Sequence, residues 1–369
     1  MIIVMKADTD ANSDEVQRVV ELAQRFPGVS TEIHQIQGAT RVLTELYLLG
    51  STGTIPTDPF EEFTCVEKVV RITEKFRSIG RHGGDLAAVG FEYNGIKISQ
   101  DDFHLFPGLC AVDKREHVDT MFAALARHGI QTARAGAYKP RTSPYDFQGL
   151  EAECLPYVFE LAGHHGIRIV SMEVTHESHL DQIQQALHEC GHATGVMVQI
   201  GTRNAQNFEL LKAVGQQDEL PVLFKRGMGI TLTESLNACE YVASGGNRRI
   251  VFCLRGMKTN FGDPHRNLVD FGHVSVIRRL TRLPVCVDPS HSVGSRSVSP
   301  DGLLDIFHAT AQGVISGANA VLVDFHPHPE EALCDGPQAL RLEELEHFIE
   351  DARVVREAYE KRLAIRPEG

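Results

Sequence analysis

The segments IRIVSMEV (residues 167–174) and GVMVQIG (residues 195–201) decide the fold of this chain. Both are almost wholly apolar, as expected of parallel strands that are buried on both faces. Six similar runs lie around them: LCAV (109–112), TARAGA (132–137), PVLFKRG (221–227), RRIVFCLRG (248–256), LPVCVDPS (283–290) and ANAVLVDFH (318–326). Eight such strands alternating with amphipathic helices predict an α/β fold of the closed (β/α)8 TIM-barrel type. An open doubly wound sheet is the structural alternative, but no GxGxxG follows the first strand.

The first 80 residues form a separate unit in front of the barrel. The pattern predicts strands at 1–6, 30–37, 41–50 and 66–73 and a helix at 13–25. This order is close to the βαββαβ of a ferredoxin-like domain, although the second helix is poorly written around residues 51–63. The Gly-rich segment SIGRHGGDLAA (78–88) follows, and FEYNGIKIS (91–99) predicts a β-hairpin with Asn94-Gly95 at its turn. We therefore predict a small α+β domain over residues 1–80 and a TIM barrel over residues 81–369.

Composition excludes several classes of partner. The chain has 369 residues, 42% of them hydrophobic, and a formal net charge of −13, so we expect neither nucleic-acid nor membrane-surface binding. No stretch approaches the roughly 20 apolar residues of a membrane span, and the apolar run in MIIVMKADTD is far shorter than a signal-peptide core. We expect a cytoplasmic protein. The eight cysteines form no CxxC pair, which favours reduced thiols.

Polar side chains fall at the ends of the predicted strands, where a buried strand does not otherwise tolerate them. In chain order they are Cys110, Arg134 with Lys139, Glu173, Arg203, Lys225 with Arg226, Arg255, Asp288 with His291, and Asp324 with His326. The carboxyl ends of barrel strands meet at one face. A single arginine there is most simply a surface salt bridge. Several cations on one barrel mouth suit phosphate groups and a carboxylate, because guanidinium groups pair bidentately with both.

A second constellation consists of Cys110, His291, Asp324 and Asp335. A thiolate, an imidazole and carboxylates form a mixed donor set that suits Mn, Fe, Co or Zn better than Mg. Taken alone, Cys110 is more often a buried apolar filler, and His291 is equally a group that supports a ligand. The four residues lie far apart in the sequence and converge only if the barrel forms.

Five segments resemble a known family: GAYKPRTSPYDFQGL (136–150), QIGTRNAQNFELLKAVG (199–215), VLFKRGMGITLTESLNACEYVASGGN (222–247), LPVCVDPSH (283–291) and HPHPEEALCDGPQAL (326–340). They resemble the 3-deoxy-D-arabino-heptulosonate 7-phosphate (DAHP) synthases of the branch related to 3-deoxy-D-manno-octulosonate 8-phosphate (KDO phosphate) synthases. The resemblance implies a metal-assisted condensation of phosphoenolpyruvate with erythrose 4-phosphate. This transferase reaction releases phosphate and is the first step of the shikimate pathway to aromatic amino acids.

The resemblance also implies roles for individual residues. The metal ligands would be Cys110, His291, Asp324 and Asp335. Phosphoenolpyruvate would be held by Arg134, Lys139, Arg203, Lys225 and Arg255, with Lys139 also near the reacting centre. Arg141 and Thr142 would hold the aldose phosphate, and Glu173 would order water and the positive cluster. The catalytic residues predicted in this way are Lys139, Glu173, Cys110 and His291.

Three departures from the family pattern bear on metal and substrate. The usual GPCSVES is GLCAVDKRE (108–116), and the usual glutamate ligand of VEVHP is Asp324 in VDFHP (323–327). The shorter aspartate must move the metal or the backbone, which leaves the metal's identity open. The loop CLRGMKTNFGDPHRNLVDF (253–271) is more like that of a KDO phosphate synthase. The alternative is therefore a related synthase that acts on another aldose phosphate, in KDO phosphate synthesis or in specialised metabolism, although KPRT and the N-terminal domain favour erythrose 4-phosphate.

The N-terminal unit is similar to the ferredoxin-like domain of some family members, where it serves feedback inhibition by aromatic amino acids. The resemblance therefore implies an aromatic amino acid as inhibitor. An oligomerisation or barrel-capping module is the alternative. By analogy with barrels of this superfamily, we expect a homotetramer.

Overall fold

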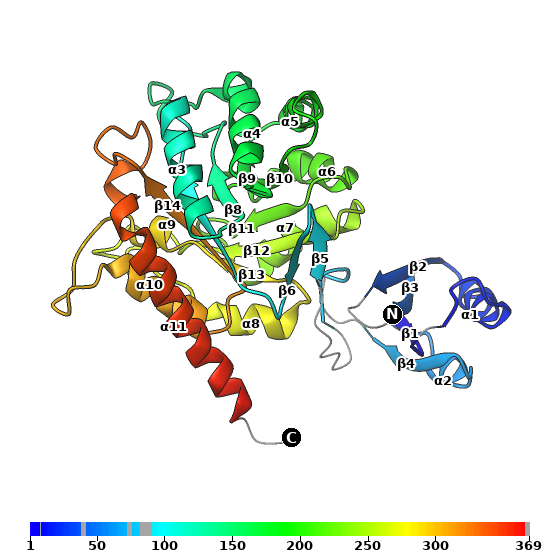
Figure 1. Ribbon diagram of the computed structural model, residues 1–369. Coiled ribbons are helices and arrows are strands. Elements are labelled where there is room, and N and C mark those ends of the chain that lie inside the picture. Colours follow the sequence, from blue (N-terminus) through cyan, green and yellow to red (C-terminus); the bar gives the residue numbers. More distant parts are fainter. Residues whose placement is uncertain (8, 38–41, 72–75, 82–89, 366–369) are drawn as a thin grey trace. The chain divides into compact units, whose positions relative to one another are not determined.

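The computed structural model describes residues 1–7, 9–37, 42–71, 76–81 and 90–365 (Figure 1). The chain divides into two compact units, Met1–Val89 and Gly90–Gly369. The boundary predicted after residue 80 lies next to residues 82–89, which are outside the described residues, as is most of the Gly-rich segment 78–88. That boundary stays a prediction.

The N-terminal unit is an antiparallel sheet with two helices. Its elements are β1 (Ile2–Met5), α1 (Asp14–Gln24), β2 (Val29–Gln37), β3 (Val42–Gly50), α2 (Asp58–Glu61) and β4 (Val66–Val70). The strands lie in the order β2-β3-β1-β4, and this βαββαβ arrangement confirms the predicted ferredoxin-like fold. The second helix, α2, for which the sequence pattern is weak, is a single turn of four residues. The predicted strand at 66–73 ends at Val70, and its residues 72–73 lie outside the described residues.

The core of this unit lies between the sheet and its helices. Ile3 and Met5 alternate onto one face of β1, where Val16 and Val19 of α1 and Phe60 of α2 are buried with them. Burying a side chain of this size contributes about 1.5–3 kcal/mol. A single helical turn is unstable alone, so the position of α2 depends on Phe60.

The second unit is a closed barrel of eight parallel strands. These are β7 (His104–Leu109), β8 (Thr132–Ala135), β9 (Ile169–Val174), β10 (Gly195–Ile200), β11 (Val222–Lys225), β12 (Ile250–Leu254), β13 (Val285–Val287) and β14 (Ala320–His326). Each pairs with the next, and β14 pairs with both β13 and β7. The closure confirms the predicted TIM barrel. A short strand, β15 (Leu340–Arg341), extends the sheet beside β14.

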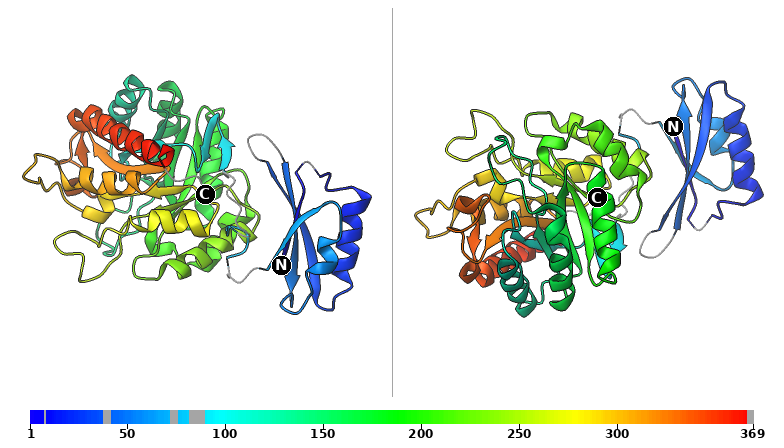
Figure 2. Two further views of the ribbon diagram at one scale, coloured as in Figure 1. Left: turned by 90° about the horizontal axis from the view of Figure 1, so that it is seen from below. Right: turned by 90° about the horizontal axis from the view of Figure 1, so that it is seen from above.

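Helices follow each strand and form the outer layer of the barrel (Figure 2). They are α3 (Arg115–Arg127), α4 (Leu155–His164), α5 (Ser178–Glu189), α6 (Phe208–Gln216), α7 (Leu232–Ser244), α8 (His273–Leu280), α10 (Asp305–Ile315) and α11 (Leu345–Ala364). The short helix α9 (Pro289–Val293) follows β13 and is wholly buried. Single 3-10 turns lie at Glu151–Cys154, Thr202–Asn204, Gly336–Gln338 and Leu342–Glu344. No helix among the described residues is both long and apolar enough to cross a membrane.

The predicted hairpin, β5 (Gly90–Tyr93) and β6 (Ile96–Ser99), packs at the amino ends of the barrel strands. Asn94 and Gly95 at its turn both have positive φ, 48° and 78°, as a two-residue hairpin turn requires. The Tyr93 hydroxyl accepts from the backbone N–H of Val196 in β10 at 3.1 Å. Ile98 is buried with apolar side chains of the strands. One end of the barrel is therefore closed by apolar packing.

Candidate active site

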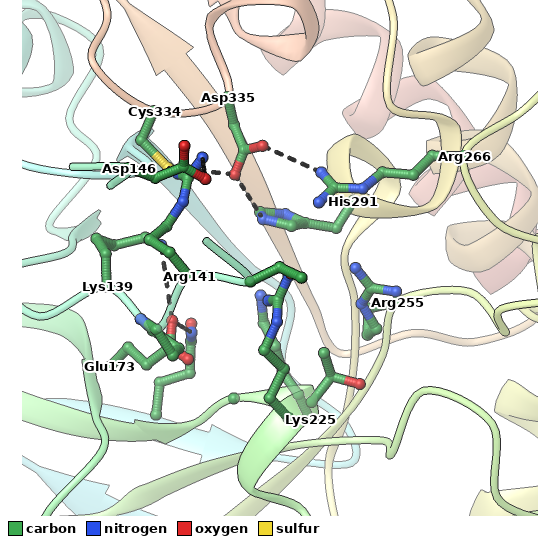
Figure 3. Close-up of a pocket in the computed structure, with 16 residues that line it drawn as sticks. Lys139, Arg141, Asp146, Glu173, Lys225, Arg255, Arg266, His291, Cys334 and Asp335 are labelled. Atoms are coloured by element: carbon green, nitrogen blue, oxygen red, sulfur yellow. Dashed lines mark hydrogen bonds and ion pairs between the residues drawn. The ribbon is translucent and has the colours of Figure 1, made fainter. Parts of the chain in front are cut away.

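The carboxyl ends of the strands surround a cavity of about 180 Å³ (Figure 3). Its lining consists of Lys139, Pro140, Arg141, Thr142, Asp146, Glu173, Gln199, Gly201, Thr202, Arg203, Lys225, Arg255, Arg266, His291, Cys334 and Asp335. Nine of the twelve predicted site residues belong to this lining. The other three are joined to it, since Cys110 contacts Lys139, Asp324 contacts His291, and Arg134 contacts Cys110 and Asp324. The barrel thus brings all twelve together, while their roles stay predictions.

The segment after β8 lies tightly against the end of β7. Val112 N–H donates to the carbonyl of Gly136 at 2.8 Å. A Cβ on Gly136 would lie 2.3 Å from the Cys110 carbonyl oxygen, so this approach requires glycine. The backbone N–H of Lys139 donates to the carbonyl of Gln148 at 2.8 Å and closes the loop that carries KPRT. This geometry places Lys139 Nζ 3.4 Å from Cys110 Sγ.

His291 is held by the cap of the short helix α9. The Asp288 carboxylate accepts from the backbone N–H of His291 at 3.0 Å and lies 3.1 Å from its Nδ1. The other ring nitrogen, Nε2, lies 3.8 Å from Cys110 Sγ and 3.6 Å from Asp335 Oδ2. Burial alone would lower the pKa of His291, but Asp288 and Asp324 raise it to about 10. A carboxylate on one ring nitrogen, with the other facing further donors, is typical of metal-binding histidines.

Two buried thiols lie beside His291. Cys110 Sγ is 3.9 Å from Cys334 Sγ, and the two sulfurs lie 3.2 Å and 3.4 Å from Asp335 Oδ2. The hydrogen bond between the thiols raises the pKa of Cys110 and lowers that of Cys334. Arg141 Nη1 also donates to Cys334 Sγ, at 2.7 Å. The second oxygen of Asp335 accepts from Arg266 at 3.1 Å, so Oδ2 is left to face the sulfurs.

Asp324 is fully buried and has partners of its own. It forms an ion pair with Arg134, and its Oδ2 accepts from Gln338 Nε2 at 2.5 Å. Its contact with His291 is through Nδ1, at 3.6 Å. Asp324 therefore lies on the Nδ1 side of the imidazole, whereas Cys110 and Asp335 lie on the Nε2 side.

The buried Cys, His and Asp groups are suited to hold a metal ion. Cys110 Sγ lies 3.2 Å from Asp335 Oδ2 and 3.8 Å from His291 Nε2. The distance between His291 Nε2 and Asp335 Oδ2 is 3.6 Å. Ligands about 2.0–2.3 Å from a tetrahedral metal lie roughly 3.3–3.8 Å from one another. The donor set and its spacing therefore fit a first-row divalent ion, and the sulfur and imidazole donors favour a softer ion than Mg²⁺.

The cations of the pocket differ in whether the protein neutralises them. Lys139 Nζ lies 3.6 Å from Glu173, and Lys225 Nζ lies 2.5 Å from Asp288. Arg255 is only 2% exposed, yet its Nε and Nη1 donate to no acceptor among the described residues. A buried guanidinium without acceptors is costly unless a ligand supplies them. Arg255 therefore indicates an anion-binding site beside the candidate metal ligands.

Another buried cluster joins the ends of β7 and β14. Asp113 lies 2.9 Å from His117 Nδ1 and 2.9 Å from His326 Nε2, and His326 Nδ1 accepts from the backbone N–H of His328 at 3.0 Å. Burial raises the pKa of Asp113, but the two histidines lower it more. Both nitrogens of His326 have partners, so this is a hydrogen-bonded support. It ties the segment after Cys110 to the segment after Asp324.

The sequence reasoning missed two side chains of the cavity lining that contact predicted site residues. Arg266 belongs to the loop 253–271 and contacts Asp335 and Gln338. Cys334 precedes the predicted Asp335, and its position in LCDG (333–336) was the signal that could have revealed it. Strand ends guided the prediction, and neither residue lies at one.

The sequence model of the DAHP synthetase I family matches residues 77–361. The chain belongs to that family. The model of the DAHP synthase ferredoxin-like domain matches residues 1–74, in agreement with the fold of the N-terminal unit. The predicted resemblance is thereby confirmed over both parts of the chain.

A curated relative of this DAHP synthetase I family member and a solved structure each match nearly its whole length. The chain is 34% identical over 360 residues to phospho-2-dehydro-3-deoxyheptonate aldolase of Thermotoga maritima. The aligned region covers 97% of this chain and 98% of that protein. A crystal structure of a DAHP synthase from Thermotoga maritima superposes with a TM-score of 0.68 at 32% identity, over 97% of each chain. A 2-dehydro-3-deoxyphosphooctonate aldolase of Legionella pneumophila is 32% identical over only 146 residues, 38% of this chain and 52% of that protein.

Proposed function

We propose that the chain condenses phosphoenolpyruvate, erythrose 4-phosphate and water to DAHP and inorganic phosphate. This is the 3-deoxy-7-phosphoheptulonate synthase reaction, the first step of the shikimate pathway, and we place it in the cytoplasm. The observation that carries the proposal is the unpaired, buried Arg255 beside the thiol, imidazole and carboxylate donors. An anion site next to a metal site is what a reaction between two phosphorylated substrates needs.

The metal would be Mn, Fe, Co or Zn, held by Cys110, His291 and Asp335, with Asp324 as the fourth residue of the predicted set. When bound, it supplies Lewis-acid polarisation of the aldehyde oxygen. Asp288 fixes the ring of His291, since it binds both Nδ1 and the backbone N–H. The metal-facing nitrogen is thereby held in one orientation.

Phosphoenolpyruvate would bind against the predicted cations Arg134, Lys139, Arg203, Lys225 and Arg255. Arg255 offers donors that no protein acceptor takes up among the described residues, so it would hold the carboxylate or the phosphate. Lys139 lies between Cys110 and Glu173, at 3.4 Å and 3.6 Å. Glu173 would position this ammonium, and a fixed cation there stabilises the charge that builds as phosphate departs.

Arg141 and Thr142 would hold the phosphate of the aldose. Thr142 Oγ1 lies 3.5 Å from Arg203 Nη2, so the KPRT loop meets the cations of the other substrate site. The side chains of Arg141 and Thr142 both line the cavity. An aldose phosphate held there would share one cavity with the predicted metal ligands His291 and Asp335.

One observation favours a second substrate. Arg266 comes from the loop 253–271, whose sequence is like that of KDO phosphate synthases, and it lines the cavity and contacts Asp335. A five-carbon aldose phosphate is therefore the alternative to erythrose 4-phosphate.

For the N-terminal unit we propose binding of an aromatic amino acid that inhibits the synthase, and for the whole protein a homotetramer. The ferredoxin-like fold and its match over residues 1–74 support the first proposal. Superfamily analogy alone supports the second.

The deciding experiment is phosphate release from phosphoenolpyruvate by manganese-loaded protein. Erythrose 4-phosphate, arabinose 5-phosphate and ribose 5-phosphate are offered in separate reactions, and the product's mass is determined. We expect rapid release with erythrose 4-phosphate and a seven-carbon product. Preference for a five-carbon phosphate would support the alternative substrate. If none of the three aldose phosphates caused phosphate release, both the proposed reaction and its alternative would be contradicted.

A further inference from the structure

Arg226 is a charged residue at a strand end to which the proposed reaction gives no role. It follows Lys225 directly, yet it is only 1% exposed and does not belong to the cavity lining. Its Nη1 donates to Asp270 Oδ2 at 2.8 Å and lies 3.0 Å from His273 Nδ1. Asp270 is itself buried. A buried ion pair is no more stabilising than apolar side chains of similar volume, so stability alone does not account for this pair.

Asp270 connects Arg226 to the backbone beside Arg255. Its other oxygen, Oδ1, accepts from the backbone N–H of Gly256 at 2.9 Å. The next residue, Met257, exchanges two backbone hydrogen bonds with Leu268, both of 2.9 Å. The base of the loop 253–271 is therefore closed just after Arg255, and one carboxylate fixes it to the Arg226 guanidinium.

The main chain of Arg226 supports a second cation of the cavity. The carbonyl of Arg226 accepts from Thr202 Oγ1 at 2.8 Å. Thr202 begins the single 3-10 turn that also contains Arg203. One buried arginine thus lies next to, or one contact away from, the segments that carry three of the cations predicted for phosphoenolpyruvate: Lys225, Arg203 and Arg255. Figure 3 shows Lys225 and Arg255 at the cavity.

We propose that Arg226 and Asp270 are positioning residues of the anion site. Neither belongs to the cavity lining, so both act through Arg255, and Arg226 acts also through Arg203. A guanidinium pairs bidentately with an anion only in a defined orientation, which requires that the backbone carrying it be fixed. The inference rests on the proposed function in taking phosphoenolpyruvate as the anion.

The test is calorimetric titration of the full-length chain with phosphoenolpyruvate, without any aldose and well below the melting transition. The principal variant is the double substitution Arg226→Met with Asp270→Leu. It replaces the ion pair by apolar side chains, whereas either change alone would leave one charge buried without its partner. We expect the double variant to melt close to the wild type. It should bind phosphoenolpyruvate roughly 10- to 100-fold more weakly, because a misplacement of about 1 Å can cost about 100-fold.

Two further variants separate positioning from general stability. Asp270→Asn keeps the shape of the side chain and one oxygen, so its affinity should lie between those of the wild type and the double variant. Arg356→Met is the matched control, because Arg356 of α11 has an 11% exposed side chain and pairs with Glu360 at 2.7 Å, outside the cavity lining. It should lower the melting temperature and leave the affinity unchanged. Wild-type affinity in the double variant or in Asp270→Asn, or an equal loss in Arg356→Met, would overturn the inference.

Binding and reaction are measured separately, so the two proposals can fail separately. The expected losses of affinity in a protein that releases no phosphate with any aldose would refute only the proposed reaction. Inorganic phosphate is titrated as a second probe. If the wild type binds phosphate but not phosphoenolpyruvate, the proposed reaction fails, and the same comparison of variants with phosphate decides the inference.

Discussion

At the amino ends of the barrel strands, Ile98 and the hairpin side chains Phe91, Tyr93 and Ile96 pack against apolar residues of the strands. At the carboxyl ends, the same strands present the charged lining of the cavity and the buried Arg134, Lys225 and Arg255. Apolar burial stabilises a fold. Buried charges cost stability unless they are paired. The amino end of the barrel therefore contributes stability through apolar packing, and the carboxyl end holds cations in place for ligands.

The strand β12 shows this division within one element. Arg249 precedes it and lies over the Tyr93 ring, 5.9 Å from the ring centre. Arg255 follows it and is buried with two donor nitrogens that lack acceptors among the described residues. The arginine at the amino end of β12 thus packs on an aromatic ring, whereas the arginine at its carboxyl end keeps two donors for a ligand.

The largest effect should come from Cys110→Ala. We expect phosphate release to fall roughly 1000-fold or more, because metal catalysis contributes several kcal/mol and each 1.36 kcal/mol is a factor of ten. The melting temperature should stay close to that of the wild type. Cys190→Ala serves as control. Near-wild-type turnover by purified, metal-stripped Cys110→Ala protein would refute the metal assignment.

Arg255→Gln should lower kcat/KM for phosphoenolpyruvate roughly 100-fold, since losing one partner of a buried charge contact costs about 2–5 kcal/mol. Without substrate, the variant should melt at or above the wild-type temperature, because it removes an unpaired buried charge. Arg249→Ala is the matched control at the other end of β12 and should leave kcat/KM unchanged. Equal losses in both variants would contradict the division between the two ends.

Ile98→Ala should affect stability alone. Truncating a buried isoleucine to alanine costs about 2–5 kcal/mol, so thermal unfolding of the barrel should begin several degrees lower. Turnover per folded molecule should not change at temperatures well below the transition. Calorimetry and a phosphate-release assay on the same sample check both statements. A loss of turnover without a loss of stability would show that the closed end also shapes the site.

The fold was predictable because its signals are local. Near-continuous apolar runs such as residues 167–174 specify strands without knowledge of their partners, and Asn94-Gly95 specifies its turn. The weakest prediction concerned α2, a single turn that Phe60 holds by tertiary packing. Such packing leaves no periodic signal in the sequence.

The site was predictable in its residue types and less so in its partners. Strand ends revealed Arg255 and His291, because charge is rare there. Cys334 was missed, since its position beside Cys110 depends on how the turn before Asp335 folds back over the barrel. The contact of Asp324 with Gln338 rests on β15 and the turn before it, which the sequence does not show to be near β14. The sequence thus could not predict which loops from distant parts of the chain contact one another.

Removal of residues 1–89 should have the smallest effect on the reaction itself. Every lining residue of the cavity lies between Lys139 and Asp335, and the barrel unit has its own apolar core, so it should fold alone. We expect phosphate release by the chain 90–369 within a few-fold of the wild type, and loss of any inhibition by Phe, Tyr or Trp. The full-length chain, assayed in parallel with the same amino acids, is the control. A well-folded but inactive truncated chain would show that the N-terminal unit completes the site.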